Sequence, residues 1–132
     1  MDSNSSSRRK TSKFRIIAST LVALTFYTLW GVWANRDFGP QAMLLAGVTQ
    51  GVFSALVTLC MTHFLEQLLA GTGSLWQRRL RAVSITTLAL VLLSLVAHWL
   101  VGTEAVIMTV LPSWVFGTLY AIAYVWVVTA TD

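Results

Sequence analysis

The chain has 132 residues, of which 56% are hydrophobic and 11% are charged. Soluble domains carry roughly 25% charged residues, so this composition excludes a globular protein that covers itself with polar surface in water. The net charge of +4 does not indicate a nucleic-acid partner, because the basic residues gather beside apolar segments, where we expect membrane lipids instead.

Four uncharged apolar stretches account for most of the chain, and the predicted spans are residues 16–34, 42–65, 82–103 and 112–130. A hydrocarbon core of about 30 Å needs roughly 20 helical residues, which each stretch supplies or nearly supplies. The sequence therefore predicts an all-α membrane protein, a four-helix transmembrane bundle formed by a single domain over residues 14–132.

The basic residues predict how the bundle is oriented. Residues 1–13 are Ser-rich, basic and without apolar periodicity, and we expect them to form a disordered cytoplasmic tail. Eight of the nine Lys and Arg residues precede the first span or lie between the second and the third, and only Arg36 lies in the opposite loops. The positive-inside rule then places both termini in the cytoplasm. The compact loops favour a bacterial inner membrane.

The first span is expected to be an uncleaved helix, because its apolar run exceeds the roughly 7–15 residues of a signal-peptide core. It ends in an outer aromatic belt of Tyr27, Trp30 and Trp33. The connection over residues 35–40 is short, so helices one and two are predicted to be adjacent and antiparallel. Pro40 fits the start of helix two, where its missing N–H costs nothing.

Helix two carries a stripe of small and polar residues at three- and four-residue spacing. The stripe consists of Gly47, Gln50, Gly51, Ser54, Thr58 and Thr62. Gly47 and Gly51 form the small-xxx-small pattern that lets two helix backbones approach closely. Burying Gln50 in hydrocarbon without a partner would cost several kcal/mol, so it must face another helix, another subunit or a wet cavity. The stripe therefore predicts either helix packing, within the bundle or an oligomer, or a substrate path.

His63 and Glu66 near the end of helix two share one face, close enough to hydrogen-bond. An ionisable pair in a membrane is a candidate proton or ligand site. The alternative is an interfacial pair with Arg78 or Arg81, because twenty residues of helix already use about 30 Å. No metal site is expected, because His98 should lie at the opposite, outer interface, nearly a full membrane from His63.

Residues 74–81 form an amphipathic cytoplasmic stretch in which Arg78, Arg79 and Arg81 can reach lipid phosphates. Helix three is aliphatic and predicted to be largely exposed to lipid. Residues 104–111 either form a short outer interfacial helix or extend helix four, with Pro112 as the break or kink.

Tyr120 and Tyr124 in helix four are neighbours at i, i+4. They either line a pocket, with a hydroxyl that can reach Gln50, or pack as aromatic side chains. No Gly-rich phosphate loop, HExxH or other catalytic pattern is present, so we expect neither an enzyme nor a bound cofactor.

The size and the four-span layout resemble the small multidrug resistance transporters in architecture. Those proteins rely on a deep acidic residue in the first helix, which residues 16–34 lack, and several insert in both orientations, unlike a chain with this basic asymmetry. Small bacterial flippase-type and assembly-factor proteins share the layout too, without a motif that identifies one, and no family is assigned.

Three functions remain open at this point. The favoured hypothesis is an accessory, assembly or scaffold subunit of a larger membrane complex that handles lipid or a lipid-linked substrate. The second is a small homo-oligomeric transporter or flippase with a polar path along helix two. The third is a holin-like pore former, suggested by the small size and the basic end.

Overall fold

The computed structural model describes residues 3–130, with side chains from residue 14 onward. Its elements are α1 (Ser3–Ala34), the short 3-10 helix η1 (Arg36–Phe38), α2 (Pro40–Leu69), α3 (Leu75–Leu100) and α4 (Val106–Val128). Each of the four α-helices contains a segment long and apolar enough to cross a membrane. The predicted all-α bundle of four membrane-spanning helices is confirmed.

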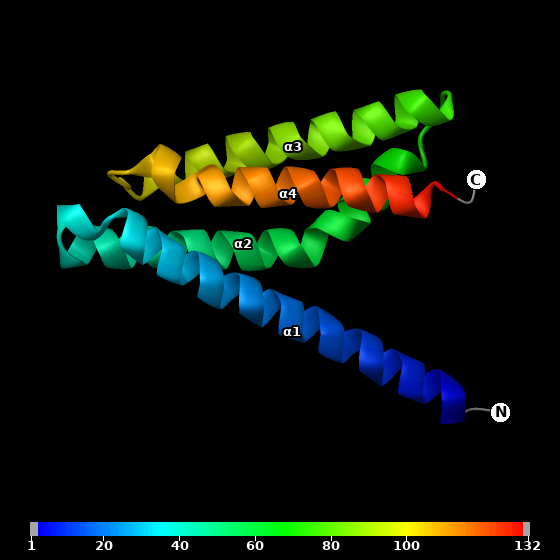
Figure 1. Cartoon of the computed structure of the whole chain (residues 1–132), viewed down its shortest axis with the longest axis horizontal. Helices are drawn as coiled ribbons and strands as arrows, with labels where there is room; N and C mark the ends of the chain where they lie inside the picture. The colour runs from blue at the N-terminus through cyan, green and yellow to red at the C-terminus, as the bar shows by residue number, and fades with distance from the viewer. Residues whose placement is uncertain (1–2, 131–132) are drawn as a thin grey trace.

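Helix α2 is central: it packs most extensively against α1 and also contacts α3 and α4, while α3 and α4 pack against each other. Figure 1 shows α1 lying against the first half of α2 and then running away from it toward the N-terminus. Only 6% of the most apolar segment of α1 is buried, against 22–28% in the other three helices. Helix α1 is therefore held against α2 over one half of its length and is splayed from the bundle over the other.

Three glycines explain where α1 and α2 touch. A Cβ on Gly31 would lie 2.8 Å from the carbonyl oxygen of Ala46, and one on Gly47 would lie 2.9 Å from that of Thr28. A Cβ on Gly51 would overlap the Thr28 hydroxyl. Because these distances are shorter than van der Waals contacts, only glycine permits this crossing, as in other membrane helix pairs with small residues at the interface.

The N-terminal segment differs from the expected disordered tail. Helix α1 begins at Ser3, so residues 3–13 continue the helical backbone of the first span. These residues contain no Gly or Pro to stop a helix, and the apolar turns that follow supply the nucleus from which helix extends at little cost. Residues 1 and 2 of the predicted tail lie outside the described residues.

Helix α3 begins a full two turns before the predicted span. Ser74 caps it: its hydroxyl accepts from the Gln77 N–H, and the Gln77 side chain accepts from the Ser74 N–H. This capping box satisfies two of the N–H groups that a helix start leaves without partners. The amphipathic stretch over residues 74–81 is thus the first part of α3 rather than a separate segment.

Helix α4 runs without interruption from Val106 through Pro112. The extension of helix four is therefore the correct one of the two alternatives for residues 104–111, and a separate interfacial helix is not formed there. Pro112 lies seven residues into α4, far enough from its start that its ring displaces a backbone hydrogen bond.

Both ends of the described chain and the α2–α3 connection lie at one end of the bundle, and η1 and the α3–α4 connection lie at the other (Figure 1). The residues Arg78, Arg79 and Arg81 follow that α2–α3 connection. The basic residues on either side of the first two spans therefore belong to the same end of the molecule, as the antiparallel arrangement requires.

Candidate functional site

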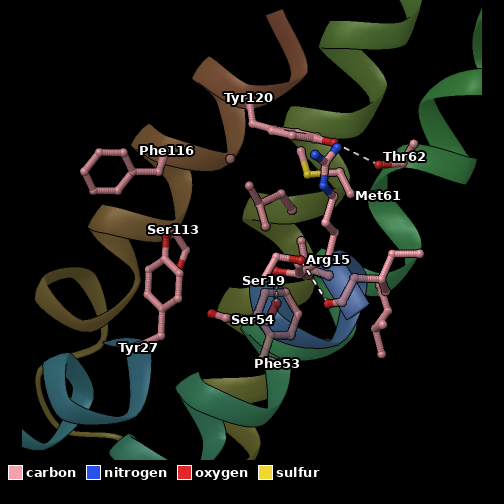
Figure 2. Close-up of a pocket in the computed structure, with 16 residues that line it drawn as sticks. Arg15, Ser19, Tyr27, Phe53, Ser54, Met61, Thr62, Ser113, Phe116 and Tyr120 are labelled. Carbon is pink, nitrogen blue, oxygen red and sulfur yellow. Dashed lines mark hydrogen bonds between the residues drawn. The ribbon is translucent and has the colours of Figure 1, made fainter. Parts of the chain in front are cut away.

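The divergence of α1 leaves a cavity of about 550 Å³ that is lined by residues of α1, α2 and α4 and by Leu90 of α3. Figure 2 shows side chains from these helices around it. Half of the lining residues are apolar. The polar ones are Arg15, Ser19, Tyr27, Ser54, Thr58, Thr62, Ser113 and Tyr120. A cavity of this volume is in the range of ligand pockets, and its share of polar residues is high for a wall formed by apolar helices.

One end of the cavity carries a pair of hydroxyls. Thr62 Oγ1 and Tyr120 Oη are 2.8 Å apart and share one hydrogen bond. Two hydroxyls bring two protons, and one such bond uses one of them, so the pair keeps an O–H available to donate. In Figure 2 the Arg15 side chain extends from α1 toward this pair. This end therefore offers a positive charge and a hydroxyl donor.

The deeper end of the cavity is neutral and polar. The Ser54 side chain is 5% exposed, and its hydroxyl has no hydrogen-bond partner among the described residues. Its carbonyl oxygen accepts from the Thr58 hydroxyl at 2.8 Å. Ser54 and Thr62 are eight residues apart, which corresponds to about 12 Å along the helix. The cavity thus has two polar ends, separated by about two turns of α2.

Gln50 lies just beyond the deep end and joins three elements. Its amide nitrogen donates to Ser113 Oγ of α4, and its amide oxygen lies 2.7 Å from His98 Nε2 of α3. Both Gln50 and His98 are fully buried. An amide oxygen can only accept, so His98 Nε2 is the donor. Of the partners expected for Gln50, the described contacts give it other helices of the same chain.

His98 lies in the last turn of α3, and its side chain is buried inside the bundle rather than exposed. The reason is the end of α3: Gly102 adopts a φ of +69°, and the Thr103 N–H donates to the His98 carbonyl oxygen at 3.0 Å. This is a Schellman motif, which glycine permits because a Cβ disfavours that backbone conformation. The motif turns Thr103 back, so that its hydroxyl lies 2.8 Å from His98 Nδ1.

A second buried polar cluster, which the sequence reasoning missed, centres on Asn35. Its amide nitrogen donates to the Gly31 carbonyl oxygen at 3.0 Å and to Thr109 Oγ1 at 2.8 Å. Its amide oxygen accepts from the Ala105 N–H at 3.0 Å. The cluster fastens the end of α1 to the start of α4. Asn35 directly follows the apolar first span, so from the sequence alone it resembles an ordinary loop residue.

The expected pairing of His63 with Glu66 does not form. His63 Nε2 lies 2.9 Å from the Gln67 amide nitrogen, and Glu66 Oε1 accepts from the Tyr124 hydroxyl at 2.7 Å. The spacing on one helix allowed the pair, but the Glu66 carboxylate instead bonds Tyr124 of α4. The Tyr124 and Tyr120 rings are stacked, with centroids 5.9 Å apart. Neither tyrosine bonds Gln50.

The three arginines proposed as lipid contacts each have partners within the chain. The Arg78 and Arg81 guanidinium groups donate to carbonyl oxygens at the end of α2, those of Leu69 and Leu68. Arg79 donates to the Thr129 hydroxyl and carbonyl oxygen, at 2.7 and 3.0 Å. They supply donors for carbonyl groups that helix ends leave without partners, at the negative ends of two helix dipoles.

Within the part of the chain that the structure describes, no three His, Cys, Asp or Glu side chains gather into a metal site. The comparisons with known proteins give no further guidance. No family model, curated protein or solved structure matches this chain. The case for a function therefore depends on the residues and geometry of this molecule.

Proposed function

We propose that this small integral membrane protein handles lipid, taking the polar head of a bilayer lipid into the cavity between α1, α2 and α4. The observation that carries the proposal is the cavity of about 550 Å³ with polar side chains on the walls of membrane-spanning helices. Polar groups that face hydrocarbon are costly, so a polar wall inside a span is a functional candidate.

The shape of the bundle supports a lipid rather than a water-soluble ligand. Residues of both α1 and α2 line the cavity, and Figure 1 shows α1 running away from α2 toward the N-terminus. Residues in this part of α1 are exposed, among them Ile16 at 50% and Ile17 at 59%. A lipid whose head enters at this side can leave its acyl chains in the surrounding bilayer. No desolvation of the chains is then needed, because they remain in hydrocarbon throughout.

A site-specific photo-crosslink tests lipid entry directly. A benzophenone amino acid replaces Phe116, which lines the cavity. The protein is irradiated in native membranes, and mass spectrometry of the intact protein detects lipid adducts. The matched control is Leu119, which is 56% exposed like Phe116 but does not line the cavity. We expect a defined lipid adduct at Phe116 in clear excess over Leu119. Equal adducts at both positions would reflect only the surrounding bilayer and would contradict the proposal.

In the wider membrane we propose that the protein is an accessory or assembly subunit, presenting a lipid or lipid-linked substrate to a larger complex in a bacterial inner membrane. The short connections between the described helices support this, since they leave little chain outside the bilayer for chemistry of its own. Mild-detergent purification with mass spectrometry of co-purifying proteins tests it. A stoichiometric larger partner is expected, and a lone monomer or a clean homo-oligomer would count against the subunit role.

A second candidate function, a flippase or transporter, is favoured by the contacts that lead from Glu66 to the cavity. Tyr124 donates to Glu66, stacks on Tyr120, and Tyr120 bonds Thr62 at the cavity wall. A change in the protonation of the Glu66 carboxylate can therefore affect side chains in the cavity wall. In reconstituted vesicles, Glu66→Gln is expected to slow proton-coupled transport, and an unchanged rate would remove the coupling.

A further inference from the structure

The charges around the cavity define which lipid head it suits. Arg15 is the only charged residue that lines it, and no Asp or Glu does. Among the described side chains the one ion pair joins Arg36 to Asp37 at the opposite end of the bundle. The Arg15 guanidinium therefore faces the cavity without a described carboxylate to neutralise it, and an anion is the ligand that would complete it.

The hydroxyl groups point to the same chemistry. The Thr62–Tyr120 pair retains one O–H for an acceptor next to Arg15. At the deep end the Ser54 hydroxyl is buried without a partner. A buried hydroxyl without a hydrogen bond carries a free-energy cost, because it has lost its bonds to water. An acceptor oxygen on a ligand would remove that cost, whereas a hydrocarbon chain would not.

We infer that the cavity is a headgroup site for an anionic phospholipid, whose phosphate is held by Arg15 and the neighbouring hydroxyl pair. Ser54, about two turns of α2 away, donates to an oxygen of the headgroup that lies deeper in the cavity. The inference rests on the proposed function and names its ligand. A phosphate offers several acceptor oxygens and a negative charge, matching a guanidinium and hydroxyl donors. A zwitterionic lipid carries a phosphate too, but its ammonium group would be placed near Arg15.

The test uses spin-labelled lipids in nanodiscs that contain the full chain. Electron paramagnetic resonance measures the immobilised fraction of labelled phosphatidylglycerol and of labelled phosphatidylcholine. Lipids around the bundle also contribute, and a Ser19→Trp variant, which fills the cavity from α1, gives that background. We expect the wild type to immobilise more phosphatidylglycerol than the background, with a preference over phosphatidylcholine of about fivefold, the effect of one basic residue near lipid.

Two variants separate charge from hydroxyl donation. Arg15→Gln is expected to bring the preference close to one, whereas Arg36→Gln, which removes a charge at the other end, keeps it. Ser54→Ala is expected to lower binding of both lipids about threefold, as loss of one hydrogen bond. Ser84→Ala, an exposed serine of α3 outside the cavity, serves as its control and leaves binding unchanged.

The failures are distinguishable. Equal immobilisation of both lipids above the Ser19→Trp background would overturn the anionic headgroup site and leave lipid binding standing. No excess of either lipid over that background would overturn lipid binding itself, and the headgroup inference with it. An unchanged preference in Arg15→Gln would exclude Arg15 as the phosphate ligand, and unchanged binding in Ser54→Ala would exclude the deeper donor.

Discussion

At the scale of single residues, the contrast between Gln50 and Ser54 separates structure from function. The two lie one turn apart on α2, and both are buried. Gln50 has its amide groups bonded to His98 and Ser113, whereas the Ser54 hydroxyl has no partner among the described residues. Satisfied polar groups fix how helices pack, and an unsatisfied one in a cavity wall is what a ligand would complete.

Replacing Gln50 by Leu is expected to destabilise the bundle by about 1–3 kcal/mol, because it leaves the His98 N–H buried without an acceptor. Thermal unfolding in detergent micelles measures the loss. The double variant Gln50→Leu with His98→Phe should recover part of it, since both partners are then apolar. If the double variant were as unstable as the sum of the two single changes, the pair would not be coupled.

At the scale of helices, the contact of α1 with α2 decides whether the cavity exists. The glycine crossing holds one half of α1 against α2, and the other half runs free of it (Figure 1). Thr58 donates to the Ser54 carbonyl oxygen within α2, a bond that often bends helices. Figure 1 shows α2 bending toward α3 in its second half, away from α1. The two departures together leave the space that becomes the cavity.

Overpacking the crossing with Gly51→Ile is expected to cost about 1–3 kcal/mol, because the new side chain meets Thr28 and the backbone at Leu24. The midpoint of thermal aggregation, followed by size-exclusion chromatography, should fall. Val48→Ile, on an exposed position of the same helix, adds a methylene outside the crossing and should leave the midpoint unchanged. A similar fall in both variants would show that this crossing is not a special contact.

The cap of α3 gives a smaller effect. Ser74→Ala removes the hydroxyl that accepts from the Gln77 N–H, and an N-cap of this kind contributes about 0.5–2 kcal/mol. Helix α3 should fray at its first turn, which hydrogen exchange of amides 75–78 measures as faster exchange. Thr72→Ala, in the preceding connection, is the control. Equal protection in both variants would mean that packing alone holds the start of α3.

At the scale of the whole molecule, the apolar composition and length of the spans were enough to predict four membrane-crossing helices, because a bilayer imposes both. Which polar side chains bond one another across the helices was not predictable. Nothing in the spacing of helix two says that Gln50 meets His98, since that contact depends on Gly102 turning the end of α3. The divergence of α1 likewise depends on tertiary contacts. The sequence alone therefore could not decide whether the stripe from Ser54 to Thr62 packs against another helix or lines a substrate path.

The orientation of the bundle is a prediction for intact cells. In a Cys60→Ser background, single cysteines replace Thr72 in the α2–α3 connection and Glu104 in the α3–α4 connection, both exposed. The positive-inside rule predicts that the basic end faces the cytoplasm. A membrane-impermeant maleimide should then label Glu104→Cys in intact cells and Thr72→Cys only after permeabilisation. The reverse pattern would place both termini outside.

The central claim, that the splayed helix α1 creates a lipid site, is tested most directly by native mass spectrometry of three proteins released from the same membranes. These are the wild type, the cavity-filling Ser19→Trp, and Val22→Trp, a change on α1 at a position that is 68% exposed and does not line the cavity. We predict one retained lipid in the wild type and in Val22→Trp, and its loss in Ser19→Trp. The same lipid occupancy in all three proteins would contradict the claim.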